Sequence, residues 1–350
     1  MGSRSPSYQA LLRELAKLLE GGQDAPALLA HLDRVWGRRT FQAYYERPLL
    51  LLASLRFDAL RDGPTHPLWS ALASDTPSSA DVQQRTILEA LRDDRLGLWT
   101  TLGTRRVQTN ETSRAVVWLW PAQLAGCDNG ERPVALVDVG ASAGLNLVAD
   151  QLPRVWRDSA DVAVPTAHRP SVIARLGLEP RPLDVRREDD VRWLHACLWP
   201  GETDRRARLD AAIRAMLVAY KSGAGPAIER TNASTAAARI ATLERTLPPD
   251  AVIFAYQTLV AGYLPPEEAE AYRDTMSALV ESLPQGRVAW LEMELSENPK
   301  ARLPANITAH VKGYAGRDAL VLARCGFHPA EVAVRSDAAS AFRAAIAARA

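Results

Sequence analysis

The sequence predicts an α/β protein with a doubly wound, mostly parallel sheet, antiparallel C-terminal strands and an all-α N-terminal region. Three observations support this fold class. Residues 1–125 carry apolar side chains at helical spacing, with no competing strand pattern. Five short apolar runs then alternate with helical patterns, as βαβ units require. Between residues 306 and 335 the pattern changes to an alternation that is typical of antiparallel hairpins.

Four helices are predicted in the N-terminal region, and a polar segment follows them. Pro48 is expected to interrupt the third helix, because a proline inside a helix removes a backbone donor. Asp81 is expected to cap the fourth helix, and Asn110 a further helix that runs from Arg114 to Trp120. The four helices are expected over residues 11–21, 26–35, 41–60 and 82–91.

The rest of the chain is predicted to alternate strands with helices, and we expect a domain boundary near residue 125. Residues 1–125 would form a helical lid or substrate region, and residues 126–350 an α/β domain. Strands are expected over residues 134–137, 171–179, 226–231, 250–256 and 287–293. Helices are expected from residue 145 onward and over residues 189–199, 209–220, 235–247, 266–283 and 337–348.

Composition and charge narrow the functional classes. The net charge of +1 gives no electrostatic reason to expect nucleic acid or an anionic membrane as a partner. No apolar run is long enough to span a bilayer, and charged residues are scattered through the first 25, so we expect a cytoplasmic protein. The three cysteines and six histidines show no metal-ligand spacing, so we expect neither a metal site nor a disulfide framework. The oligomeric state stays open.

The stretch VALVDVGASAGLNLVAD, which begins at Val134, combines an apolar strand, a turn of small residues and a helical pattern. Gly140 and Gly144 allow backbone angles closed to other residues and let a ligand approach the main chain. Asp138 brings a carboxylate to the same place. A P-loop requires Gly-Lys, and a dinucleotide fingerprint requires glycines at two positions that carry other residues here, so neither pattern fits.

The spacing acid-x-Gly-x-x-x-Gly, with small residues between the glycines, resembles the first motif of class I S-adenosylmethionine (SAM) dependent methyltransferases. This resemblance implies a Rossmann-like fold and SAM as the cofactor, with its methionine part against the glycine turn. The antiparallel C-terminal strands agree with a class I methyltransferase-like fold. The cofactor-binding positions that the resemblance implies at the turn are Asp138, Gly140, Ala141, Ser142, Gly144 and Asn146.

A second resemblance covers most of the chain. The order QTNE, VGASAGLNL, PLDV with the RWL and LWP that follow it, and then the strand with Tyr256, is similar to an uncharacterised bacterial family. That family is known only as a domain of unknown function, and it is distantly similar to SAM methyltransferases. The resemblance runs from about Phe41 to Arg335 and does not indicate a substrate.

The methyltransferase resemblance also implies adenosine contacts. In that family an acidic residue at the end of the second strand binds the ribose hydroxyls, and Glu179 and Asp184 compete for this role. An acid usually follows the third strand, near the adenine. Asn232 stands there instead, and its side chain could hydrogen-bond the adenine amine.

Residues just after the fourth strand face the methyl group in the methyltransferase fold, which nominates Tyr256, Gln257 and Tyr263 as groups close to the reaction. Glu292 and Glu294 alternate on or after the fifth strand, so their side chains should share one face of the sheet. We take Tyr256, Gln257 and Glu292 as candidate catalytic residues, with a carboxylate serving as base or substrate anchor.

Two functions remain open from the sequence. The first is a SAM-dependent methyltransferase that acts on a small-molecule acceptor. The second is a non-catalytic, regulatory protein that binds SAM or a nucleotide on a degenerate methyltransferase scaffold. A dinucleotide oxidoreductase is disfavoured by Leu145. If the helical region covers the strand ends as a lid, it excludes water and places a polar segment near the ligand. The residues of that segment are Gln108, Asn110, Glu111 and Arg114.

Overall fold

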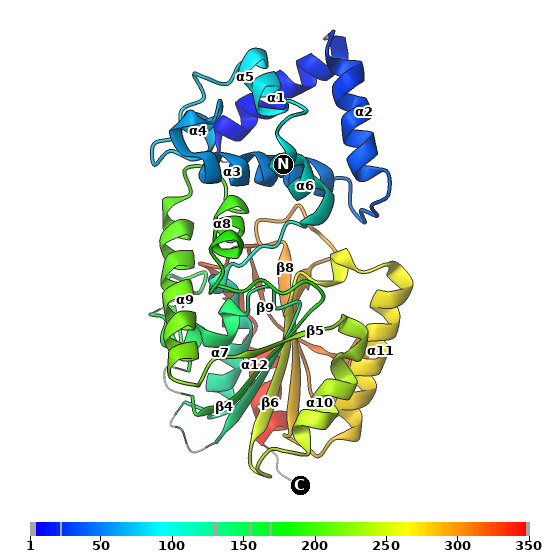
Figure 1. The fold of residues 1–350 in the computed structure, drawn as a ribbon. Helices are drawn as coiled ribbons and strands as arrows, with labels where there is room; N and C mark the ends of the chain where they lie inside the picture. The colour runs from blue at the N-terminus through cyan, green and yellow to red at the C-terminus, as the bar shows by residue number, and fades with distance from the viewer. Residues whose placement is uncertain are drawn as a thin grey trace. The chain divides into compact units, whose positions relative to one another are not determined.

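The computed structural model describes residues 5–21, 23–128, 130, 132–153, 156–167 and 170–347. The chain divides into two compact units (Figure 1). The helical unit comprises residues 1–109 and 184–209, and the α/β unit comprises residues 110–183 and 210–350. Residues 184–209, which follow the second long strand in sequence, therefore belong to the helical unit.

The helical unit is organised around α3 (Glu46–Asp62), in which every residue from Leu50 to Ala59 is buried. A helix that is covered on all sides needs partners around it, and α6 and α8 both contact α3. The described part of this unit contains α1 (Pro6–Gly21), α2 (Ala25–Trp36), α3, η1 (Gly63–Thr65), α4 (Trp69–Leu72), α5 (Gln84–Ala90), α6 (Leu96–Thr104), α8 (Glu188–Ala196) and the start of α9 (Thr203–Lys221).

Two predictions about helix ends in this unit are wrong. Pro48 does not interrupt α3, because the helix begins at Glu46 and the proline falls in the first turn, where a backbone donor has no partner within the helix. Asp81 does not cap α5, which begins later, at Gln84. The Gln83 backbone N–H donates to the Thr86 hydroxyl at 3.0 Å instead, and the Asp81 carboxylate accepts from the Ser70 hydroxyl at 2.8 Å.

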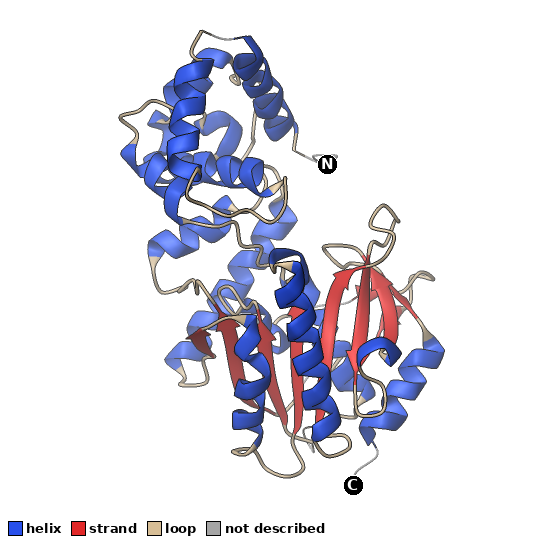
Figure 2. Cartoon of the chain, turned by 90° about the vertical axis from the view of Figure 1, so that its right-hand side faces the viewer, coloured by secondary structure: helices blue, strands red, loops and turns tan. Residues whose placement is uncertain are grey.

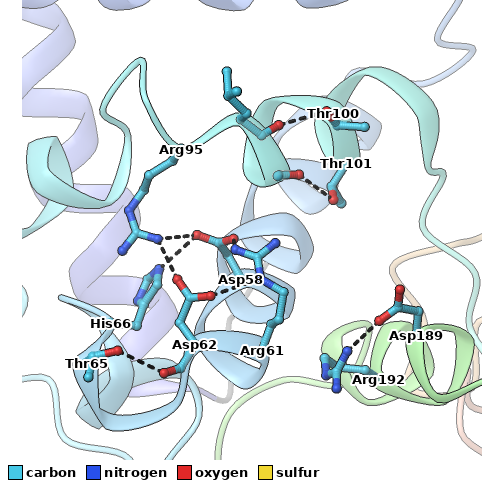
Figure 3. Close-up of polar contacts among 12 residues, drawn as sticks. Asp58, Arg61, Asp62, Thr65, His66, Arg95, Thr100, Thr101, Asp189 and Arg192 are labelled. Carbon is cyan, nitrogen blue, oxygen red and sulfur yellow. Dashed lines mark hydrogen bonds and ion pairs between the residues drawn. The ribbon is translucent and has the colours of Figure 1, made fainter.

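A buried charge cluster lies inside the helical unit (Figure 3). Asp58 on α3 is fully buried, and its carboxylate accepts from Arg95 at 2.6 Å and also from Arg61. Arg95 reaches Asp62 as well, at 2.9 Å. His66 Nε2 lies 3.4 Å from Asp58. Each buried charge therefore has a counter-charge, as burial requires.

The α/β unit is built on an eight-stranded sheet in the order β10-β9-β8-β7-β6-β1-β4-β5. Neighbouring strands in the run β5-β4-β1-β6-β7 pair in parallel. Beyond β7, the strands β8, β9 and β10 continue the sheet in antiparallel pairing. The mixed α/β class, the mostly parallel sheet and the antiparallel ending confirm these three parts of the predicted fold class. The strands are β1 (Val134–Val139), β4 (Val172–Glu179), β5 (Ala227–Arg230), β6 (Val252–Thr258), β7 (Val288–Leu295), β8 (Ala305–His310), β9 (Leu320–Cys325) and β10 (Val332–Val334), with a separate pair β2 (Trp156–Arg157) and β3 (Ala163–Val164).

Helices pack on both faces of this sheet (Figure 2). Alternate residues of each strand point to opposite faces, so Leu136 and Phe254 meet α7 and α12, whereas Val137 and Ile253 meet α10 and α11. The helical segments are η2 (Thr112–Ala115), α7 (Val116–Leu124), η3 (Leu145–Gln151), η4 (Ala233–Thr235), α10 (Ala236–Glu244), η5 (Ala261–Tyr263), α11 (Pro266–Ser282), η6 (Gly316–Asp318) and α12 (Ser336–Ala347).

Two further predictions need correction here. The helix expected after the glycine turn is a short 3₁₀ segment, η3, with non-helical backbone at Val148. Asn110 does not cap the helix that follows it. The Glu111 carboxylate accepts from the Ser113 backbone N–H at 3.1 Å in that role, because the Asn110 amide is engaged elsewhere. Within the described residues, no helix combines the length and apolarity needed to cross a membrane.

Candidate functional site

The candidate site lies at the carboxyl end of β1, where the order of the parallel strands reverses. The strand that follows β1 in the parallel set, β4, pairs with one side of it, and β6 pairs with the other. Connections on the two sides diverge at such a position, and α/β proteins bind ligands in the crevice that results. The residues brought there by the three strand ends include Asp138, Glu179 and Tyr256.

The turn after β1 needs small residues for reasons of backbone and packing. Gly140 and Gly144 have φ of 78° and 73°. A Cβ on Gly140 would lie 2.6 Å from Val260 Cγ2, and one on Gly144 would lie 2.6 Å from Ile228 Cδ1. Ser142 also has a positive φ, 53°, which is uncommon for a residue with a side chain. Among the turn residues 140–144 Gly140 alone is exposed, so the main chain at the strand end is accessible there.

Ser142 joins three segments of the α/β unit. Its backbone N–H donates to Glu179 Oε2 at 2.9 Å, and its hydroxyl accepts from the Asn110 side-chain amide at 2.7 Å. Its carbonyl accepts from the Leu183 backbone N–H at 3.3 Å. The second oxygen of Glu179 accepts from the Arg181 backbone N–H at 2.9 Å. These bonds hold the strained turn against the end of β4 and against the segment that contains Asn110.

Asp138 and Tyr256 face each other across β1 and β6, at paired register positions. Asp138 is 3 % exposed, and burial raises the pKa of its carboxyl well above the ordinary value. Burial, followed by the Asp138 charge, raises the pKa of Tyr256, which is therefore a neutral hydroxyl at physiological pH. The Asn146 side-chain oxygen is buried without a hydrogen-bond partner among the described residues, whereas the Tyr256 hydroxyl interacts with the Asp138 carboxyl.

Gln257 lies on the opposite face of β6 and uses its whole hydrogen-bonding capacity inside the protein. Its amide nitrogen donates to Glu292 at 3.2 Å and to Glu294 at 2.9 Å. Its oxygen accepts from the Tyr272 hydroxyl and from Trp290 Nε1. Because an amide has two donors and two acceptor positions, this buried side chain is saturated.

Glu294 connects the polar group around Gln257 to the loop after β6. Its Oε1 accepts from the backbone N–H groups of Val260 at 2.8 Å and Ala261 at 3.1 Å. Burial, with a smaller contribution from the charge on Glu292, raises the pKa of Glu294. Leu259, just before these two amides, has a φ of 58°. This carboxylate therefore fixes the strained loop whose Val260 side chain lies against Gly140.

His310 extends the polar group around Gln257 on the side of Glu292. Its Nε2 lies 2.8 Å from Glu292 Oε2, and its Nδ1 accepts from the Gly316 backbone N–H at 3.2 Å. Because that N–H can only donate, Nδ1 carries no proton and Nε2 donates to Glu292. The imidazole also stacks on Trp290, with ring centroids 4.0 Å apart.

Comparison with known proteins places the chain in a family. Residues 1–333 match the sequence model of a family described as uncharacterized protein conserved in bacteria, DUF2332. The chain belongs to this family. The family resemblance predicted from the sequence is thereby confirmed, whereas the resemblance to methyltransferases stays a prediction. No curated protein matches the chain significantly.

In this DUF2332 protein, some predicted site residues come together and others do not. Asn110, Asp138, the turn 140–144 and Glu179 meet at the strand ends, with Asn146 close behind in sequence. Asn232 follows β5 and is exposed, next to Thr231, whose N–H donates to the Glu179 carbonyl at 3.1 Å. Tyr256 is on the face of Asp138. Gln257 and Glu292 are on the opposite face, where Glu294 joins them, so the prediction that the two glutamates share a face is confirmed.

Three predicted residues lie elsewhere. Gln108 and Asp184 belong to the helical unit, and Asp184 is paired there with Arg186 at 2.8 Å. Arg114 does belong to the α/β unit, but its Nε donates to the Phe327 carbonyl at 3.0 Å, beyond β9. Of the two acids that compete for the ribose role, Glu179 therefore lies at the glycine turn within the α/β unit.

The sequence prediction missed two histidines of the α/β unit. His310 ends β8, and His328 lies in the connection between β9 and β10, with Nδ1 3.4 Å from Glu111 Oε2. Only the turn-like GFHP sequence singles out His328, and it indicates a turn rather than chemistry. Among the described residues, no group of acidic, histidine or cysteine side chains is arranged to hold a metal ion.

Proposed function

We propose that this protein binds SAM at the carboxyl ends of β1, β4 and β6 and transfers its methyl group to a small-molecule acceptor. One observation supports this above the others. The strand at the order reversal ends in an exposed Gly140, and the carboxylates of Asp138 on β1 and Glu179 on β4 lie at the same strand ends.

The arrangement of strands supports the proposal at the level of the fold. The parallel order β5-β4-β1-β6-β7, with helices on both faces, supports a doubly wound, Rossmann-like interpretation of the sheet. The resemblance of the turn to the first methyltransferase motif then directs the choice among the ligands that such sheets bind. The strands β8, β9 and β10 extend the sheet beyond β7 in antiparallel fashion, as the proposal requires.

The two carboxylates would have different roles. Glu179 ends β4 beside the glycine turn, where its carboxylate accepts from the backbone N–H groups of Ser142 and Arg181, and there it would contact the ribose hydroxyls. Asp138 is buried with a raised pKa. A cationic group beside it, such as the ammonium of the methionine part, would favour its ionised form and would pair with it.

Methyl transfer from a sulfonium requires mainly proximity and alignment, which a rigid strand end supplies. Two of the residues nominated for chemistry are unsuited to proton transfer. Gln257 is saturated by its partners, and the raised pKa of Tyr256 keeps its hydroxyl neutral. These observations favour, as a second candidate, a regulatory protein that binds SAM or a nucleotide at the same strand ends.

Calorimetry of the full-length protein with SAM, S-adenosylhomocysteine and NAD tests the binding step. We expect both SAM compounds to bind and NAD not to bind. Glu179→Gln should weaken the binding free energy of SAM by about 1.5–3 kcal/mol, the usual contribution of a hydrogen bond to a charged group. Asp184→Asn is the matched control and should leave the affinity unchanged, because Asp184 is paired with Arg186.

Three results would contradict the proposal: binding of NAD in place of SAM, equal effects of the two substitutions, or no binding at all. A SAM-binding protein that turns over no acceptor would support the regulatory alternative.

A further inference from the structure

Val260, in the loop after β6, covers one side of the glycine turn. The three atoms nearest to a Cβ on Gly140 would all belong to Val260: Cγ2 at 2.6 Å, Cγ1 at 3.7 Å and Cβ at 3.8 Å. Gly140 is nevertheless exposed, and Val260 is half-buried. A ligand atom that touches the main chain at Gly140 therefore has the Val260 side chain as a neighbour.

The loop that carries Val260 is fixed to β7. Leu259 leaves β6 with a φ of 58°, a conformation that costs free energy for a residue with a side chain. Its backbone N–H donates to the Met293 carbonyl at 2.8 Å. The next two N–H groups, of Val260 and Ala261, donate to the Glu294 carboxylate at 2.8 and 3.1 Å. These bonds hold the strained loop, and with it Val260, in one place.

Three donors converge on a single oxygen of Glu294. Oε1 accepts from the N–H groups of Val260 and Ala261 and from the Gln257 side-chain amide, which lies at 2.9 Å. Because all three bonds end on the same oxygen, a glutamine at this position could accept them through its own side-chain oxygen. An alanine could accept none of them.

The turn itself is poorly suited to a phosphate. Turns that bind phosphate point several backbone N–H groups at it, at the N-terminus of an α-helix. Here the N–H groups of residues 140, 141, 142 and 144 donate to acceptors within the protein, and that of Ser142 donates to the Glu179 carboxylate. The segment that follows is the short 3₁₀ element η3 rather than an α-helix. A phosphate at Gly140 would lose hydration without gaining these hydrogen bonds.

The Val260 side chain suits an aliphatic group at the same place. Its methyl groups cannot form hydrogen bonds, so a charged group pressed against them is desolvated without compensation. A methylene chain removes apolar surface from water there instead, which favours binding.

We propose that Val260 is the specificity-determining residue of the glycine turn and that Glu294 is its positioning residue. Val260 admits a ligand whose segment at Gly140 is aliphatic, and it disfavours a phosphate. This inference rests on the proposed function and deepens it, because it names the part of SAM that Val260 contacts: the methylene chain of the methionine part. It also gives a physical reason for the exclusion of NAD and of nucleoside diphosphates.

The first experiment needs no ligand. Amide hydrogen exchange of the full-length protein, followed by NMR, measures how firmly the Val260 and Ala261 N–H groups are held. Glu294→Ala should raise both exchange rates by about tenfold, whereas Glu294→Gln should keep most of the protection. Amides in the middle of β6 are the internal reference and should change less. Glu297→Ala, which removes an exposed carboxylate from the connection after β7, is the matched control and should change neither rate.

Three results would overturn the positioning role of Glu294. The first is unchanged protection of the two loop amides in Glu294→Ala. The second is equal loss of protection in Glu294→Gln and Glu294→Ala. The third is an equal rise in exchange throughout β6, which would show a general loss of stability.

The second experiment measures, by calorimetry, the affinities for SAM, S-adenosylhomocysteine, adenosine and ADP. The wild type should bind ADP no more tightly than adenosine. Val260→Lys should weaken SAM and strengthen ADP relative to adenosine, each by about tenfold, because it replaces an apolar neighbour with a cation. Gly262→Lys adds the same charge two residues further on, where a Cβ meets no atom within 4 Å. This matched control should change either affinity by less than about twofold.

The outcomes separate this inference from the proposed function. If the wild type binds neither SAM nor S-adenosylhomocysteine, the proposed function fails and the specificity role of Val260 fails with it. The exchange experiment still decides the role of Glu294 in that case. If SAM binds, tighter binding of ADP than of adenosine by the wild type would overturn the specificity role alone. Equal affinities in Val260→Lys and Gly262→Lys would do the same.

Discussion

Gln257→Leu tests whether the buried polar group on the α11 face is held together by one side chain. Gln257 is 0 % exposed and is bonded to Tyr272, Trp290 and the two carboxylates Glu292 and Glu294. Leucine fits a similar volume but offers no polar atom. The Tyr272 hydroxyl and the Trp290 N–H would lose an acceptor in a site that water does not reach.

The expected loss of stability follows from those two donors. Each buried donor left without a partner costs about 1–3 kcal/mol, so the free energy of unfolding should fall by about 2–6 kcal/mol. The two carboxylates lose a donor as well, which places the effect in the upper part of this range rather than the lower. Tyr272→Phe removes a donor together with its need for an acceptor, and it should cost only about 0.5–1.5 kcal/mol.

Urea unfolding of the three proteins measures the overall loss. Because the chain has two compact units, amide hydrogen exchange in β6 and β7 is measured as well, so that the loss is located in the α/β unit. A loss for Gln257→Leu no larger than that for Tyr272→Phe would refute this account of the polar group. So would increased exchange confined to the helical unit.

Two further predictions concern buried charges. The folded-state pKa of Asp138 lies above its ordinary value of 3.8, so its contribution to stability is present below that value and is lost as the pH rises through the folded-state pKa. The Asp138→Asn variant does not titrate at this position, so its stability relative to the wild type should increase as the pH rises above 3.8. Urea unfolding curves at a series of pH values measure this difference. A difference that stays constant with pH would contradict the raised pKa of Asp138. In the helical unit, Asp58→Asn should cost about 3–5 kcal/mol, the usual effect of removing one partner of a buried ion pair. Asp94→Asn, which breaks a pair exposed on both sides, should cost about 0–1 kcal/mol, and similar midpoints for the two variants would contradict the role of the cluster.

The sequence by itself determined where the strands lie and how their side chains divide between the two faces. Apolar runs located β1 and β6 to within a few residues, because a strand covered on both faces must be continuously apolar. Because side chains alternate between the two faces of a strand, the sequence alone predicted that Glu292 and Glu294 share one face of the sheet, and both contact Gln257 there. The small residues of the turn after β1 marked the strand end at which the polar groups of three strands meet.

The tertiary structure decided which distant groups touch, because spacing along the chain does not specify which elements pack together. Gln257 was nominated for catalysis, yet its partners on β7 and α11 occupy all its hydrogen-bonding positions. The sequence left Asp184 and Glu179 as equal candidates for the ribose contact, but the segment that contains Asp184 folds with the helical unit. His328 had no marked pattern around it. Only the pairing of β9 with β8 and β10 places its loop against Glu111, and a contact between residues so far apart in the chain leaves no periodic signal in either local sequence.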